Sequence, residues 1–161
     1  MRILIINSEF PPIGGGAGKA SANLSRGVVA MGQEVTVLTS SFADLPPDEC
    51  LDGVQVVRIK ALRRKQDRSS ALEQIIFMVL SCFATLGLMR RWRPDITLAY
   101  FGVPSGPAAL LARIFYGIPY VVSMRGGDVP GFRPYDFATY HKLVAPLLRI
   151  IWHRAEVLVA N

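Results

Sequence analysis

Short apolar runs alternate with segments of helical periodicity along most of this chain. The runs are rich in β-branched residues, which is typical of strands. Continuous apolar runs of this length indicate strands that are buried on both faces of a sheet. Six strands are therefore predicted, at 3–6, 34–40, 54–60, 95–100, 119–124 and 155–161.

Helices are predicted between most of these strands, with stop signals at their ends. Gly32 ends the first helical pattern, Pro94 follows the second and Gly117 ends the third. In a fourth pattern near 143–151, Pro146 favours a kink or a fresh helix start. The predicted helices cover 20–31, 69–92, 107–116 and 143–151, and 41–53 is predicted to be a loop.

Helical crossovers between buried strands predict an α/β fold with a doubly wound, mainly parallel sheet of the Rossmann type, in one domain covering 1–161. Such a sheet binds ligands at the carboxyl ends of its strands. Within the second helix, Ile75–Met89 carries no charge, but these 15 residues are fewer than the roughly 20 that span a bilayer. We therefore predict a buried helix there, with membrane contact as the alternative.

Composition adds a charge pattern to this fold. The chain has a formal net charge of +6. Basic residues gather in two clusters, Arg58, Lys60, Arg63, Arg64, Lys65 and Arg68 in the first and Arg90, Arg91 and Arg93 in the second. Such clusters attract anionic partners such as lipid headgroups, or they are simply solvated. Aromatic residues do not interleave with the first cluster, so we expect no nucleic-acid partner.

The two cysteines, Cys50 and Cys82, have neither the spacing of a metal site nor that of a disulfide framework. The first residues, "MRILIIN", turn polar too early for a signal peptide. The sequence therefore predicts a cytoplasmic setting and no metal site.

The loop "EFPPIGGGAGKAS" follows the first predicted strand and has the composition of a phosphate-binding loop. A nucleotide P-loop would need Gly at Ile13 and Ser or Thr at Ala20. A dinucleotide fingerprint would need a third Gly at Lys19 and an acidic residue where Thr39 stands. The alternatives that remain are a cradle of backbone amides for an anion and a plain glycine-rich turn.

Several segments together resemble one family. The opening 40 residues resemble those of family-4, GT-B-fold glycosyltransferases, with an apolar strand, "PP", a "GG" loop and "EVTVLTS". "RRWRPDITLAY", "GIPYVVSMRGGDVPGF" and "HRAEVLVAN" resemble later segments of that family. Gln33 stands where relatives usually have His, and Arg125 stands at another such position.

This resemblance implies half of a two-domain enzyme. The chain would be the N-terminal, acceptor-side domain of a retaining glycosyltransferase, separate from a C-terminal donor-binding domain and inactive alone. The reaction would move a sugar from a nucleotide-sugar to a hydroxyl of a sugar or lipid-linked acceptor. It would serve envelope polysaccharide or glycolipid synthesis at the inner face of the cell membrane, an anionic surface. The nucleotide-diphosphate sugar is a substrate, and no cofactor or metal is implied.

The resemblance also implies site residues. Arg125 cannot serve as a base, because arginine does not deprotonate, so its expected role is electrostatic. No catalytic residue is otherwise assigned. The expected donor- or acceptor-binding residues are Glu9, Gly14, Gly15, Gly16, Lys19, Arg125, Gly126, Gly127 and Asp128, and both histidines, His141 and His153, are expected to be structural.

A different class of function fits the same fold. The chain could be a stand-alone Rossmann-like binding module whose basic patch binds anions or a membrane. A second Rossmann-like half beyond Asn161, carrying paired glutamates, would favour the transferase.

Overall fold

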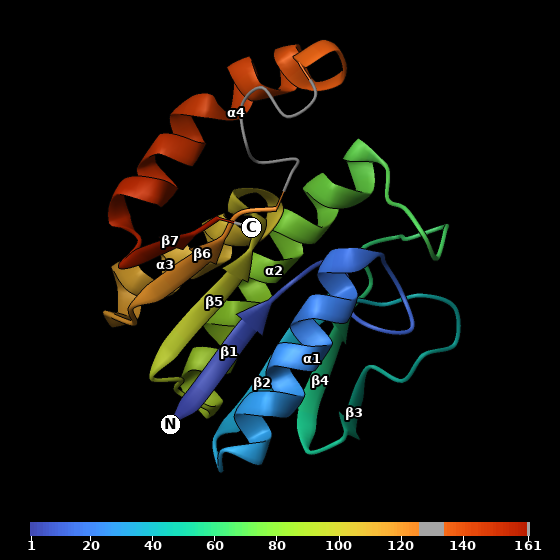
Figure 1. Ribbon diagram of the computed structural model, residues 1–161, viewed down its shortest axis with the longest axis vertical. Coiled ribbons are helices and arrows are strands. Elements are labelled where there is room, and N and C mark those ends of the chain that lie inside the picture. Colours follow the sequence, from blue (N-terminus) through green and yellow to red (C-terminus); the bar gives the residue numbers. More distant parts are fainter. Residues whose placement is uncertain (126–133, 161) are drawn as a thin grey trace.

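A computed structural model describes residues 1–125 and 134–160, with the side chains of 134–143 excepted (Figure 1). It contains a seven-stranded sheet in the order β3-β4-β2-β1-β5-β6-β7. All neighbouring strands are parallel except the β3–β4 pair. The strands are β1 (Arg2–Ile6), β2 (Glu34–Ser40), β3 (Asp48–Leu51), β4 (Val54–Ile59), β5 (Ile96–Tyr100), β6 (Tyr120–Ser123) and β7 (Val157–Val159). The predicted doubly wound, mainly parallel α/β sheet is confirmed.

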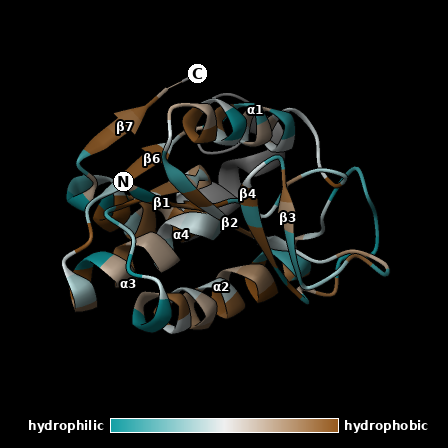
Figure 2. Cartoon of the chain, turned by 90° about the horizontal axis from the view of Figure 1, so that it is seen from below, coloured by the Kyte–Doolittle hydropathy of each residue, from teal (hydrophilic) through white to brown (hydrophobic). Residues whose placement is uncertain are grey.

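The helices lie on both faces of this sheet (Figure 2). They are α1 (Gly16–Ala30), α2 (Ala71–Arg91), α3 (Gly106–Tyr116) and α4 (Pro134–Arg154). Alternate residues of β1 point to opposite faces, so that Ile5 belongs to the core cluster under α1 while Leu4 and Ile6 belong to the cluster under α2 and α3. The first strand is thus buried from both sides, as its apolar run predicted.

Two local predictions need correction. The segment 41–53 is not all loop, because β3 pairs antiparallel with β4 at the edge of the sheet. The segment after β5, η1 (Phe101–Ser105), is a kinked turn with an extended residue at Val103, and Gly102, Pro104 and Ser105 are buried in it. Of the two alternatives at Pro146, the fresh helix start is wrong, because α4 continues through this residue, and the kink stays a prediction.

Glycines allow α4 to approach this turn closely. A Cβ on Gly102 would lie 2.5 Å from Leu148, and one on Gly106 would lie 2.8 Å from Ile151. These separations are shorter than a van der Waals contact, so any larger residue would push α4 away. The loop after β5 therefore serves packing.

The prediction that the second helix is buried is wrong. Its buried stripe is narrow and largely polar or small: Glu73, Phe77, Ser81, Thr85 and Met89. The small Ser81 and Thr85 suit a close approach, and the tertiary contacts of α2 are mostly to α3 and the sheet. Large apolar side chains of α2 face outward instead.

The first basic cluster is also smaller at the surface than the sequence suggested. Arg58 is buried, forms an ion pair with Glu49 of β3 and donates to the Pro46 carbonyl (3.2 Å). Arg63 is buried as well. Lys60, Arg64, Lys65 and Arg68 remain exposed.

Candidate functional site

The candidate site begins at Asn7, which directly follows β1 and is fully buried. Its Nδ2 donates to the Ser21 hydroxyl (3.0 Å) and to the Ala17 carbonyl (3.3 Å), both in α1. Its Oδ1 accepts from the backbone N–H of Glu9 (3.1 Å). One side chain therefore ties the start of the loop to the second turn of the helix. Sequence reasoning missed Asn7, although a polar residue at the end of an apolar strand was the signal.

The segment 9–16 that follows is called the glycine loop. Its glycines, and Gly18 just beyond it, differ in how much space surrounds them. Gly14 has a φ of +89°, and a Cβ there would lie 2.4 Å from the Cβ of Glu9. Gly18 packs against the Ile13 carbonyl, which a Cβ would approach to 3.0 Å. Gly14 and Gly18 are therefore required by the fold itself.

Gly15 and Gly16 face open space, with no atom within 4 Å of a Cβ built on either. Gly16 is the first residue of α1, where glycine is less favourable than alanine by up to about 1 kcal/mol. Nothing in the described structure requires a glycine at this position. A ligand that approaches the backbone closely would require it.

The amino terminus of α1 lacks the usual side-chain cap. Its N-cap residue is Gly15, and the first turn contains no acidic residue. By contrast, α2 has a complete capping box, in which Ser70 and Glu73 exchange hydrogen bonds. The amides at the start of α1 are thus left for another anion, and the helix dipole favours one there.

The carboxylate of Glu9 partly serves as the anion at the start of α1. Its Oε2 accepts from the backbone N–H of Gly15 (3.1 Å), so its carboxylate lies against the cradle. The predicted contact of Glu9 with sugar hydroxyls stays a prediction. Lys19 lies one turn into α1 with an exposed side chain, and its predicted role is likewise untested.

A buried arginine from the segment 60–70 connects that segment with the start of the glycine loop. Arg63 donates to the carbonyls of Ser8 (3.4 Å), Lys65 (2.9 Å) and Gln66 (3.2 Å). Gln66 in turn accepts from the N–H of Gly14 (2.8 Å) and donates to the Pro12 carbonyl (2.7 Å). Burial lowers the pKa of the Arg63 guanidinium, and the nearby carboxylates of Glu9, Glu73 and Asp67 oppose that shift. It stays charged at neutral pH, because arginine does not deprotonate in proteins.

Arg125 lies at the carboxyl end of β6 and is fixed by two neighbours. Its Nε donates to the Ser123 hydroxyl (3.1 Å), and its guanidinium lies 4.9 Å from the centre of the Tyr100 ring. This is the geometry of a cation–π contact. Burial raises the pKa of the Tyr100 hydroxyl, and the charge of Arg125 opposes the rise.

Tyr100 connects Arg125 with the glycine loop. Tyr100 and Phe10, which lies in the loop after β1, belong to one buried cluster. The carboxyl ends of β1, β5 and β6 are therefore joined by packing. The predicted site residues Gly126, Gly127 and Asp128 lie outside the described residues, as does the side chain of His141. His153 is exposed in the last turn of α4. That turn leads into the amino end of β7, away from the carboxyl ends of the strands.

The cationic groups and free amides at this edge can bind an anion such as a diphosphate. Among the described residues, no group of three His, Cys, Asp or Glu side chains could hold a metal ion.

Comparison with known proteins decides the family. A family model described as "Glycosyl transferase 4-like domain" matches residues 15–161. The chain belongs to this family. The glycosyltransferase 4-like domain is 31% identical over 144 residues to a glycogen synthase of Mycobacterium tuberculosis, covering 80% of the chain and 34% of that protein. The chain thus spans about a third of the length of this relative.

A shorter match concerns a second kind of transferase. The domain is 29% identical over 69 residues to UDP-N-acetylglucosamine--N-acetylmuramyl-(pentapeptide) pyrophosphoryl-undecaprenol N-acetylglucosamine transferase of Blochmanniella floridana. This match covers 43% of the chain and 19% of that protein.

Solved structures share the fold of the domain. Sucrose-phosphate synthase of Thermosynechococcus elongatus superposes with a TM-score of 0.78 at 14% identity, over 98% of this chain and 41% of that one. MurG of Acinetobacter baumannii superposes with a TM-score of 0.59 at 15% identity, over 99% of this chain and 41% of that one. The family resemblance and the Rossmann-like fold expected from the sequence are both confirmed.

Proposed function

We propose that this chain is the acceptor-side domain of a retaining glycosyltransferase. The enzyme moves a sugar from a nucleotide-diphosphate sugar to a hydroxyl of a sugar or lipid-linked acceptor, in envelope polysaccharide or glycolipid synthesis. A further domain holds most of the donor, and the 161 residues alone have no turnover. Membership of the glycosyltransferase 4-like family and the similarity to glycogen synthase support the reaction class.

The observation that carries the proposal is Gly16. It is the first residue of α1, has open space around it and has no conformational need to be glycine. The fold would tolerate alanine at this position. The presence of glycine is explained by a ligand that needs the space a Cβ would occupy. An uncapped helix start with exposed amides favours a phosphate-bearing ligand there.

Arg125 supplies the fixed positive charge in this proposal. The contacts with Ser123 and Tyr100 orient the guanidinium before any ligand binds. Preoriented donors stabilise a negative charge that develops on a departing phosphate, and they do so without the cost of reorganisation. We assign Arg125 to the leaving diphosphate, which would be held from the other side by the donor-binding domain.

A transfer assay on the protein at its full encoded length tests the proposal. A thermal-shift screen of sugar nucleotides identifies the donor, and proton NMR of the product shows whether the anomeric configuration is retained. Gly16→Val should lower kcat/KM by about 100-fold, in the range of losing a transition-state hydrogen-bond donor. The unfolding temperature should stay unchanged, because a side chain at this position meets nothing.

Gly27→Val is the matched control. Gly27 lies in the same helix, also with no atom within 4 Å of a built Cβ, but near the opposite end. Normal turnover is expected in this variant. Normal turnover in Gly16→Val would contradict the cradle, and an inverted product would contradict retention.

A further inference from the structure

The outer face of α2 is a continuous apolar surface. The exposed side chains are Leu72, Ile75, Val79, Leu80 and Phe83, and Leu72 and Phe83 are 65% and 69% exposed. At 100° per residue they fall within an arc of about 140°, centred opposite the buried stripe. No charged residue lies between Glu73 and Arg90. Figure 2 shows this helix on the outside of the molecule, with hydrophobic colouring along its length.

Rotation of α2 about its own axis cannot bury this surface. The buried stripe holds Phe77 in the core and Ser81 and Thr85 beneath the helix. Glu73 is fixed at the amino end by the N–H groups of Ser70 (2.8 Å) and Arg64 (3.1 Å). Among the described residues, α2 is the helix that is long and apolar enough to cross a membrane, yet it is an integral layer of this domain. An apolar patch of this kind on a folded domain indicates an interaction surface.

Basic residues border the apolar surface at both ends. Arg64, Lys65 and Arg68 are exposed beside the amino end of α2, and Arg90 and Arg91 are exposed in its last turn. Asp67 is the exposed acidic residue within the first group.

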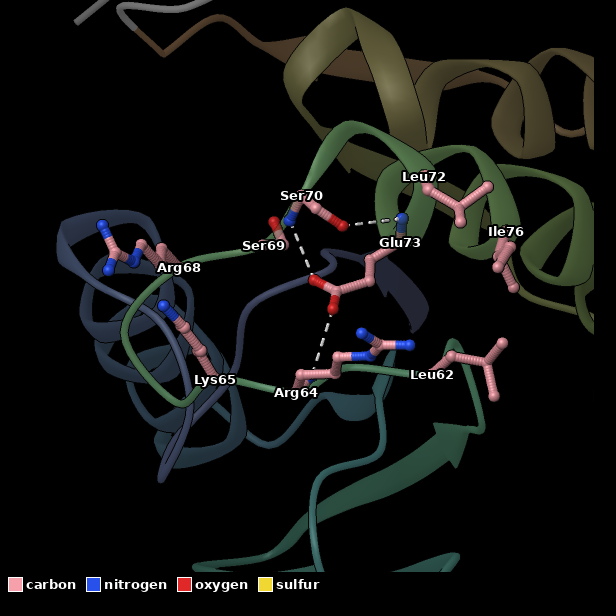
Figure 3. Close-up of a pocket in the computed structure, with 9 residues that line it drawn as sticks. All are labelled: Leu62, Arg64, Lys65, Arg68, Ser69, Ser70, Leu72, Glu73 and Ile76. Carbon is pink, nitrogen blue, oxygen red and sulfur yellow. Dashed lines mark hydrogen bonds between the residues drawn. The ribbon is translucent and has the colours of Figure 1, made fainter.

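A pocket of about 350 Å³ lies where the first group of basic residues meets the apolar side chains. In Figure 3, Leu62, Leu72 and Ile76 gather on one side of it, and Lys65 and Arg68 lie on the other. The exposed Leu62 therefore extends the apolar surface beyond the helix.

We propose that this face, made of α2 and the segment 60–70, docks on an anionic lipid bilayer with the helix axis in the plane of the membrane. An apolar helix face enters the boundary between headgroups and acyl chains, while flanking Lys and Arg side chains bind lipid phosphates. A protein partner would have to match an apolar strip with negative charge beyond both of its ends. A bilayer that contains anionic lipid offers this combination everywhere.

Docking would also orient the candidate site. The segment 60–70 that carries the basic residues is bound to the glycine loop through Gln66 and Arg63. The carboxyl edge of the sheet would therefore lie close to the bilayer. If the proposed function holds, the acceptor is a membrane-borne molecule; the docking itself does not depend on transferase activity.

Vesicle flotation of the protein at its full encoded length tests the docking. Vesicles of phosphatidylcholine are compared with vesicles that contain about 30% phosphatidylglycerol, whose negative surface potential attracts basic segments. The protein should float only with the anionic vesicles. Lys65→Gln/Arg68→Gln should weaken partitioning by about 30-fold, and added salt should weaken it further. Phe83→Ser should weaken it by about tenfold, the effect of one apolar side chain left in water.

Matched variants elsewhere on the surface serve as controls. Met31, the C-cap residue of α1 on the other side of the sheet, is 68% exposed, so Met31→Ser removes an exposed apolar side chain from another face. Arg26→Gln/Arg149→Gln removes two exposed charges that lie on α1 and α4. Neither control should change partitioning by more than about twofold. Circular dichroism and a transfer assay on soluble acceptor separate misfolding and loss of activity from loss of docking.

Three results would overturn the proposal. The protein would fail to float with anionic vesicles, or bind both kinds of vesicle equally, or respond to Met31→Ser as strongly as to Phe83→Ser. Sedimentation adds a related outcome: a dimer that Phe83→Ser dissociates, without vesicle binding, would assign the face to a second copy of the chain.

Discussion

Replacing Gly14 by alanine tests whether the glycine loop is built on the contact between Gly14 and Glu9. Two penalties are expected. The φ of +89° belongs to the left-handed region, which costs a residue with a Cβ about 1–2 kcal/mol. The new Cβ would also lie 2.4 Å from the Cβ of Glu9, which no side-chain rotation can relieve.

Relieving that overlap means moving the backbone at Glu9. Two hydrogen bonds fix this residue, from its N–H to the Asn7 Oδ1 and from the Gly15 N–H to its Oε2. Each contributes about 0.5–1.5 kcal/mol net, so their loss adds about 2 kcal/mol. Gly14→Ala should therefore lower the free energy of unfolding by about 3–4 kcal/mol, which is a drop of roughly 6–16 °C in Tm for a chain of this size.

Gly117→Ala isolates the backbone penalty. Gly117 has a φ of +70° at the end of α3 but no atom within 4 Å of a built Cβ. This variant should lose only about 1–2 kcal/mol. Urea denaturation followed by tryptophan fluorescence measures both variants, since Trp92 and Trp152 lie in separate parts of the structure.

A double-mutant cycle identifies the Glu9 contact. Glu9→Gly removes the Cβ that would collide, so Gly14→Ala should cost about 1–2 kcal/mol less in that background than in the parent. Equal losses in Gly14→Ala and Gly117→Ala, or no coupling with Glu9→Gly, would refute the argument. The loop would then be positioned by something other than this contact.

Three further predictions concern charge. Glu9→Gln removes the negative charge beside the Gly15 amide. The affinity for a nucleoside diphosphate, measured by isothermal titration, should therefore rise about two- to fivefold, as expected for one charge at the start of a helix. Unchanged affinity would place the diphosphate elsewhere. Arg125→Met should lower kcat by about 100-fold in protein that circular dichroism shows to be folded, and a variant that unfolds instead would make Arg125 structural. The backbone N–H of Ser70, and further that of Arg64, donate hydrogen bonds that lower the pKa of Glu73. The charge of Glu73 therefore stabilises the fold above the pKa of the unfolded chain, about 4.3. This stabilisation is lost as pH falls through the pKa of Glu73 in the folded protein. Glu73→Gln should cost about 1 kcal/mol at pH 7 in urea denaturation, and this deficit should shrink as pH falls below about 4; a constant deficit would show that the charge does not contribute.

Much of the sheet could be predicted because its strands are buried on both faces. Ile3–Ile6 and the segment 95–100 are apolar runs without helical spacing, so one structure fits them. By contrast, β3 (Asp48–Leu51) has the sequence "DECL", and most of it is exposed. This strand is held at the edge of the sheet by backbone pairing with β4, which leaves no hydrophobic signal in its sequence.

Burial of individual charges could not be predicted either. Arg58 and Arg63 lie in a run with four other basic residues. Arg58 shares a face of its predicted strand with Val54 and Val56, but nothing in the sequence distinguishes Arg63 from its exposed neighbours. What separates them is the position of the acceptors: Glu49 and the Pro46 carbonyl for Arg58, and three loop carbonyls for Arg63. These partners come from segments whose placement depends on the folded chain.

The sequence was misleading at α2 for a physical reason that bears on function. A helix buries the face that fits its neighbours, and the buried face of α2 includes the small side chains of Ser81 and Thr85. The hydropathy of the segment therefore comes from both faces, because Phe77 and Met89 lie in the core while Leu72 and Phe83 are exposed. Because the inner face already satisfies the fold, the exposed Leu72, Val79 and Phe83 bring no packing within this domain. Their retention together with flanking basic residues is explained by a surface outside the domain, and Arg63 and Gln66 couple that surface to the loop at the start of α1.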